Sequence, residues 1–222
     1  MTKTVWIATL PTPWFHLPIR LNDIQCNFYN QGGIIMHRLT FAVIAMLAMP
    51  AVADEAPWVG DARQIATTMP PKMMQVLKEE TAKGGSANAT VVCREKAPLM
   101  AKSISEQSGW NIRRVSLRVR NPKATPDAWE RSVLEDFDRR AAAGEDPATL
   151  EKSELVADGD KKLQRYMKAL PTQALCMTCH GAPDKLDSDL TEQLQKLYPD
   201  DKATGYRPGE IRGAITMNRV AP

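Results

Sequence analysis

The stretch CMTCHG at residues 176–181 constrains this chain more than any other part of its sequence. Two cysteines two residues apart, with a histidine directly after the second, form the pattern for covalent attachment of a c-type haem. The thiols of Cys176 and Cys179 would form thioethers with the two vinyl groups, and His180 would bind the iron on one side. Haem iron has a second axial position, so the rest of the chain has to be searched for the residue that fills it.

Two other readings of the CxxC spacing stay open at this point. A redox-active dithiol uses the same spacing, but it belongs at the start of a helix in a βαβ unit, and nothing around QALCMTCHGAP indicates one. A zinc site needs four ligands, and the set available is Cys93 with Cys176, Cys179 and His180. The number of available ligands favours one covalently bound haem c over both alternatives.

Haem c is attached outside the cytoplasm, and residues 36–53 have the pattern of an export signal. The segment MHRLTFAVIAMLAMPAVA has a short basic start, an apolar core over 39–49 and a small-residue cleavage site that ends at Ala53. Such a core is typical of a signal peptide and too short to cross a bilayer. We expect cleavage after Ala53 and a periplasmic protein, with an uncleaved anchor as the alternative.

The first 35 residues do not fit this organisation. They contain Trp6, Trp14 and Cys26 as well as several prolines, and they show no hydrophobic periodicity. We interpret residues 1–35 as an upstream extension from a wrong start assignment, with a genuine N-terminal extension as the alternative. Residues 54–222 are then expected to form a single c-type haem domain, since this length suffices for one hydrophobic core.

The composition of residues 54–222 excludes several classes of function. The segment carries 26 basic and 25 acidic residues, so a nucleic-acid partner is not indicated. It contains no apolar run long enough for a transmembrane helix. We do not expect an enzyme, because no nucleophile and base pair is visible and no second histidine is available for peroxidase chemistry.

The second axial ligand cannot be another histidine of the same chain, because His180 is the only histidine after the expected cleavage site. The remaining candidates are Cys93, a lysine, no residue, or one of seven methionines (69, 73, 74, 100, 167, 177 and 217). Cys93 is left without a partner once Cys176 and Cys179 attach the porphyrin, and a lone thiol in an oxidising compartment is exposed to oxidation unless buried or bound. A buried, inert cysteine is an equal alternative on these grounds, with Met100 as the competing ligand.

The segment around Cys93 is predicted to be helical. One face would carry Cys93, Ala97, Met100 and Ile104. Gly109 is placed to end this helix, and Pro98 removes one backbone hydrogen bond, so a kink is expected just past the cysteine.

Four runs together resemble a family of monohaem c-type proteins with a PAS-like fold, known largely as a domain of unknown function: VVCREKAP, RRVSLRVRNPKATPDAWE, CMTCHG and LYPDDKATGYRPGEIRGAITM. The resemblance covers nearly all of residues 54–222. It implies a haem held between the histidine of CxxCH and a cysteine on an N-terminal helix, and these positions correspond to His180 and Cys93. The run RNPxxxPDxWE is fairly specific to the family, whereas CxxCH is shared by all c-type cytochromes.

The hydrophobic patterns agree with an α+β domain that packs helices against an antiparallel sheet. They predict a strand over 114–120, a helix from Asp127 to Gly144, a hairpin around Asp158-Gly159, a short helix over 190–197 and a strand over 211–217.

Three further features have two readings each. The arginines between 113 and 120 either pair with haem propionates or, for most of them, form a solvated face. The turn GYRPG either brings Tyr206 or Arg207 to the haem edge or is an ordinary turn. The methionines at 69, 73 and 74 are expected to fill the core.

Two functions from different classes fit this sequence. The first is a redox or gas sensor, in which the state of the iron controls a separate partner protein. We expect reduction to weaken the bond to Cys93 and to open the iron to a diatomic gas, since a free thiol is mostly protonated near neutral pH. The alternative is a small periplasmic electron-transfer cytochrome, which would keep both axial ligands in place.

Overall fold

The computed structural model describes residues 55–222; the predicted upstream extension and signal peptide lie outside the described residues. A four-stranded antiparallel sheet forms the centre of this region, with the strand order β1-β4-β3-β2. The strands are β1 (Asn111–Val115), β2 (Glu151–Asp158), β3 (Lys161–Pro171) and β4 (Ile211–Val220). Helices pack on the sheet, so the α+β class predicted from the sequence is confirmed.

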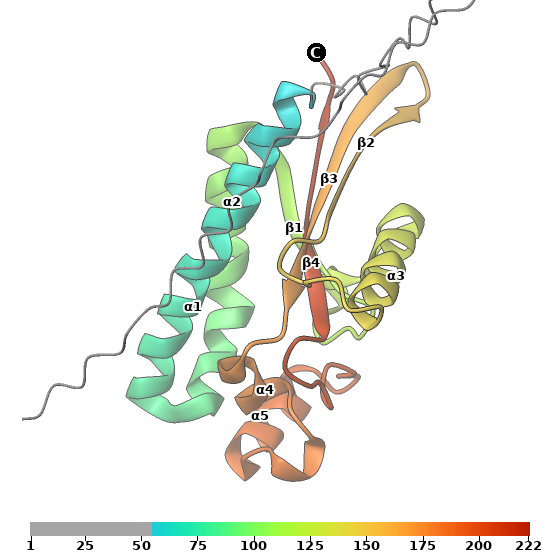
Figure 1. Cartoon of the computed structure of the whole chain (residues 1–222). Coiled ribbons are helices and arrows are strands. Elements are labelled where there is room, and N and C mark those ends of the chain that lie inside the picture. Colours follow the sequence, from blue (N-terminus) through green and yellow to red (C-terminus); the bar gives the residue numbers. More distant parts are fainter. Residues whose placement is uncertain (1–54) are drawn as a thin grey trace, which may run out of the picture. The chain divides into compact units, whose positions relative to one another are not determined.

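One face of the sheet is covered by a helical hairpin (Figure 1). Its first helix is α1 (Pro57–Val91), whose backbone leaves helical geometry at Gly84 and Gly85, and φ at Gly85 is 70°. Because glycine adopts positive φ without steric cost, the chain can reverse its direction there. A π-helical segment, η1 (Val92–Lys96), then leads into α2 (Ala97–Ser108).

The core on this face joins α1 to three strands. Its buried members are Val59, Ala62, Ala66, Met69, Trp110, Ile112, Tyr166, Ile215 and Met217. Trp110 is 1% exposed, and its indole N–H donates to Asp61 at 3.0 Å, so the polar edge of the ring is satisfied. Met69 is a core residue, as predicted, whereas Met73 and Met74 are only half-buried.

The opposite face is covered by α3 (Ala128–Ala142), whose Val133, Leu134 and Phe137 are buried against the sheet. The predicted N-terminal signal is a capping box. The Asp127 carboxylate accepts from the Glu130 backbone N–H at 2.8 Å, and the Glu130 carboxylate accepts from the Asp127 N–H at 2.9 Å. The predicted start of this helix is therefore confirmed.

Glu130 does more than cap its helix. Its side chain is fully buried, accepts a hydrogen bond from Thr216 Oγ1 at 2.8 Å and pairs with Arg113. We expect Glu130→Ala to lower the free energy of unfolding by about 3 kcal/mol, because it removes the partner of a half-buried arginine and a bond of the helix cap. Urea denaturation measures this change. Glu135→Ala, at an exposed position of α3, is the control and should change the free energy by less than about 0.5 kcal/mol; equal losses would contradict the role of Glu130.

The first strand lies three residues earlier than predicted and is shorter, covering 111–115 instead of 114–120. It ends at Val115 because Ser116 leaves the ladder: its backbone N–H donates to Ala124 O at 3.1 Å, and its hydroxyl donates to Arg212 O at 2.9 Å. The alternation that continues through Val119 therefore does not mark further strand residues. The predicted β2–β3 hairpin is present, and Gly159 (φ 57°) lies in its turn.

β4 is present as predicted, and its burial depends on the strands and helices around it. It pairs with β1 on one side and β3 on the other, and residues 211–217 are all buried. A central strand between two packed faces has little alternation in burial, because helices cover both of its sides.

Four short helices lie at one end of the sheet, where β1 ends and β4 begins (Figure 1). They are η3 (Ala174–Cys176), α4 (Met177–His180), η4 (Pro183–Lys185) and α5 (Ser188–Leu197). α5 contacts α1 and buries Leu190 and Leu194, as predicted for this helix. Among the described helices, none is both long and apolar enough to cross a membrane.

Candidate functional site

The CxxCH residues lie on two consecutive short helices. Cys176 is the last residue of η3, and Cys179 and His180 belong to α4. Both thiols are half-buried and neither forms a disulfide. Nδ1 of His180 lies 2.6 Å from the carbonyl oxygen of Ala203. Because a carbonyl can only accept, Nδ1 carries the proton, and Nε2 keeps a free lone pair that can bind a metal.

The backbone around His180 is held from two directions. The loop that follows α5 donates from Tyr206 N to His180 O at 2.9 Å and from Gly205 N to Gly181 O at 2.6 Å. From the β1 side, the guanidinium of Arg120 donates to Cys179 O at 2.6 Å. Together with the bond from the imidazole to Ala203, these contacts fix both the position and the orientation of the His180 ring.

The turn GYRPG brings one of its two candidate side chains to this histidine. The Tyr206 ring is 3% exposed and meets the His180 ring edge-on, with 6.2 Å between the ring centroids and 83° between the planes. Arg207 is exposed. The segment is therefore more than an ordinary turn, because the backbone and the ring of Tyr206 both contact His180.

Cys93 lies in the π-helical segment η1 and is exposed. The expectation of a buried, inert cysteine is therefore wrong. Burial by the protein around the thiol nevertheless raises its pKa, while Arg114, Arg120 and Arg212 lower it. Arg114, Arg120 and Arg212 are therefore the positive charges that act on this thiol.

The same three arginines, Arg114, Arg120 and Arg212, also act on His180. Burial lowers the pKa of the imidazole most, and each of the three guanidiniums lowers it further. Cys179 in turn contributes to the pKa of Cys93. The charges of Arg114, Arg120 and Arg212, which we call the three-arginine cluster, thus act on both Cys93 of the helical hairpin and His180 of α4.

The members of the three-arginine cluster differ in their partners. Arg120 forms an ion pair with Asp201 at 2.9 Å. Arg114 and Arg212 form no ion pair with any residue between 55 and 222, and the Nε atom of each is buried without a hydrogen-bond partner there. Burial lowers the pKa of Arg114, and it lowers that of Arg212 to about 9. A solvated face, the expectation for most arginines of 113–120, is wrong for Arg114 and Arg120.

The two other readings of the CxxC spacing lose support from these contacts. Among residues 55–222, no three His, Cys, Asp or Glu side chains gather closely enough to hold a metal ion, so the Cys3His zinc set is not assembled. The sheet is antiparallel and places no βαβ unit at Cys176 and Cys179, which is the setting that a thioredoxin-like dithiol would need.

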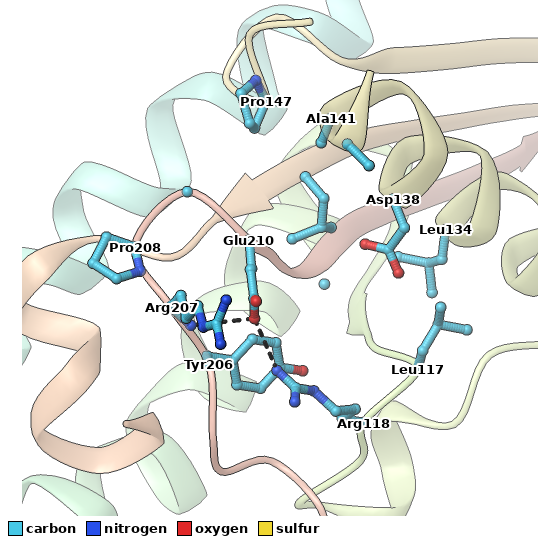
Figure 2. Close-up of a pocket in the computed structure, with 14 residues that line it drawn as sticks. Leu117, Arg118, Leu134, Asp138, Ala141, Pro147, Tyr206, Arg207, Pro208 and Glu210 are labelled. Atoms are coloured by element: carbon cyan, nitrogen blue, oxygen red, sulfur yellow. Dashed lines mark hydrogen bonds and ion pairs between the residues drawn. The ribbon is translucent and has the colours of Figure 1, made fainter. Parts of the chain in front are cut away.

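A cleft of about 880 Å³ borders Tyr206 on a side other than the one that meets His180 (Figure 2). Leu134, Asp138 and Ala141 of α3 line one wall, and the loop from Tyr206 to Glu210 lines the other. None of the CxxCH residues and no part of η1 borders it. Arg118 stacks on the Tyr206 ring at 3.4 Å and pairs with Glu210 at 3.2 Å, so Tyr206 separates this cleft from His180.

Comparison with known proteins places the chain in a family. The model of the Tll0287-like family matches residues 44–219, which is most of the sequence. The chain belongs to the Tll0287-like family. This confirms the resemblance stated from the four sequence runs. Comparison with curated proteins gives no significant match.

A solved structure of similar fold is the crystal structure of the cyanobacterial haem protein Tll0287. The TM-score is 0.54 and the sequences are 24% identical; the match covers 73% of this chain and 96% of that chain. At this level of identity the similarity concerns the fold of the Tll0287-like domain.

Three functional elements of this Tll0287-like domain were missed by sequence reasoning. The carbonyl of Ala203 and the guanidinium of Arg120 carry no signal in the sequence, because backbone acceptors and long-range donors become neighbours only through folding. Arg212 carried a weak signal: it is the one charged residue in the otherwise apolar start of the IRGAITM run.

Proposed function

We propose that this Tll0287-like protein is a periplasmic haem protein with one c-type haem attached at Cys176 and Cys179. His180 and Cys93 would be the axial ligands. Membership of the family, together with the similar fold of a protein described as a haem protein, supports haem binding. When bound, haem supplies a redox-active iron with two axial positions.

Three observations on the chain's own residues fit this group. The hydrogen bond from His180 Nδ1 to Ala203 leaves Nε2 free to bind iron. Cys93 is exposed, and the charges of the same three arginines act on Cys93 and on His180. The unpaired, buried Nε atoms of Arg114 and Arg212 suit a group that brings carboxylates.

We propose further that the protein acts as a redox or gas sensor for a separate partner protein, and not as an enzyme. The supporting observation is the difference between the two candidate ligands. His180 is held by its own ring and by the backbone bonds of its neighbours. Cys93 lies in a π-helical segment between the Gly84-Gly85 reversal and Pro98. A π-helical segment is a local irregularity that often occurs at functional sites. In a sensor, its rearrangement would move Cys93 to a second position.

Replacing Cys93 by serine tests this proposal. We expect the ferric wild type to give a low-spin EPR signal of thiolate ligation and Cys93→Ser to lose it. The reduction potential should rise in the variant, because an anionic sulfur stabilises Fe(III) over Fe(II). Met100→Leu is the control, since Met100 lies about two helical turns along the same segment, and it should keep the wild-type spectrum.

Carbon monoxide and nitric oxide then separate the two functions. For a sensor, the reduced wild type should bind both gases, with a shift of the Soret band that Cys93→Ser shows as well. If the reduced wild-type protein binds neither gas while Cys93→Ser binds both, Cys93 remains the axial ligand after reduction. In that case electron transfer would be the better account of the protein.

A further inference from the structure

Arg114 and Arg212 differ from the other arginines that the structure buries or half-buries in residues 55–222. Arg113 pairs with Glu130, Arg120 with Asp201 at 2.9 Å and Arg165 with Asp127 at 2.6 Å. The Arg114 side chain makes no hydrogen bond or ion pair with a described residue, and its buried Nε is unpaired. Arg212, which is 7% exposed, donates to Ser116 Oγ at 2.9 Å and to Arg118 O at 3.4 Å, and it pairs with no carboxylate among residues 55–222.

A guanidinium that is buried without a carboxylate partner is costly, and this part of the fold contains two. They lie on neighbouring strands, Arg114 on β1 and Arg212 at the start of β4, and the charge of Arg114 lowers the pKa of Arg212. A buried charge without a counter-charge costs several kcal/mol, and a second like charge adds to this. Residues 55–222 therefore supply no carboxylate to these two guanidiniums.

The hydrogen-bond donors of Arg114 and Arg212 indicate which kind of anion would fit here. The Nε atoms of both arginines are free and buried. A guanidinium offers Nε and a terminal nitrogen as a planar fork that fits a carboxylate through two hydrogen bonds. Arg212 lies over the Tyr206 ring, 5.1 Å from its centroid, and this ring meets the His180 ring edge-on at 6.2 Å. A carboxylate bound by Arg212 would therefore belong to a molecule beside His180.

We propose that Arg114 and Arg212 bind the propionate carboxylates of the haem and that their positive charge raises its reduction potential. This inference rests on the proposed function. The thiolate of Cys93 and the two arginines would then act in opposite directions on the potential: the sulfur stabilises Fe(III), whereas nearby cations stabilise the more negative Fe(II) state.

The structure offers a matched control. Arg118 and Arg212 both place a guanidinium over the Tyr206 ring, at 3.4 and 5.1 Å from its centroid. Arg118 has its own carboxylate partner, Glu210 at 3.2 Å, and borders the cleft of Figure 2. Removing Arg118 therefore takes away one positive charge beside Tyr206 without removing a proposed propionate partner.

The experiment compares the haem-loaded wild type with Arg114→Met, Arg212→Met and Arg118→Met. We expect the propionate bending bands in the resonance Raman spectrum to shift in the first two variants and to stay unchanged in Arg118→Met. The reduction potential should fall in Arg114→Met and Arg212→Met and change less in Arg118→Met. Arg114→Lys and Arg212→Lys keep the charge but lose the planar fork, so they should restore most of the potential while the Raman bands remain shifted.

Each outcome supports or overturns the inference. Unchanged propionate bands in both methionine variants overturn it, as does an equal shift in Arg118→Met. If a methionine variant fails to fold or to retain haem, the corresponding lysine variant decides through its Raman bands. A wild-type protein that carries no haem would refute the proposed function itself. If the wild type carries haem but the arginine variants leave its propionate bands unchanged, only this inference is refuted.

Discussion

Replacing Cys176 and Cys179 together by alanine is expected to yield a protein that carries no covalent haem. The two thiols are free, and they lie on consecutive short helices next to His180. Thioether formation needs both sulfurs, and no other residue in this segment can replace them. The measurement is haem-specific staining of the denatured polypeptide after electrophoresis, in which only covalently attached haem remains with the chain.

Cys93→Ser is the matched control for this experiment. It also removes one thiol near the same arginines, but one that lies on the helical hairpin and is not expected to form a thioether. The haem stain should therefore persist in Cys93→Ser and disappear in the double variant. A stained double variant, or loss of the stain in Cys93→Ser alone, would contradict the assignment of Cys176 and Cys179 as attachment sites.

Gly213→Ala is expected to destabilise the protein strongly, by about 4 kcal/mol in the free energy of unfolding. Gly213 has φ of 152°, and a Cβ built on it would lie 2.2 Å from the carbonyl oxygen of Val115. That oxygen belongs to the backbone of β1 and cannot rotate away. The added methyl group would have to separate β1 from β4 next to Arg212.

The control for this prediction is Gly159→Ala. Gly159 also has positive φ, 57°, but no atom lies within 4 Å of the Cβ that would be added. This variant should lose only the cost of the backbone conformation, about 1 kcal/mol. Chemical denaturation of both variants measures the difference, and similar midpoints would show that the close approach to Val115 does not matter.

Local chemistry made part of this protein predictable from its residues. The CxxCH spacing, the capping box of Asp127 and Glu130 and the hairpin turn at Gly159 each depend on residues a few positions apart. Such patterns specify a local conformation, because the interacting groups are neighbours along the chain. The α+β class was predictable as well, since hydrophobic periodicity reflects which face of each element is covered.

The predictions that were wrong concern features that depend on residues far apart in the sequence. The alternation through Val119 predicted a longer strand, but Ser116 bonds to Ala124 and to Arg212 instead of continuing the ladder. The same pattern suggested a solvated row of arginines. Instead, Arg120 donates to Cys179 O and pairs with Asp201, and the Nε of Arg114 is buried without a hydrogen-bond partner among residues 55–222.

The sequence by itself determined which residues can attach a porphyrin and bind its iron, because thiols and imidazoles are scarce after residue 53 and only His180, Cys93, Cys176 and Cys179 remain. The tertiary structure alone decided how they are arranged. The Ala203 carbonyl orients the imidazole, the π-helical segment presents Cys93, and the fold buries the Nε atoms of Arg114 and Arg212 without a hydrogen-bond partner among residues 55–222. These relations join residues far apart along the chain, and no local preference specifies them; they arise only when the sheet and the helical hairpin pack.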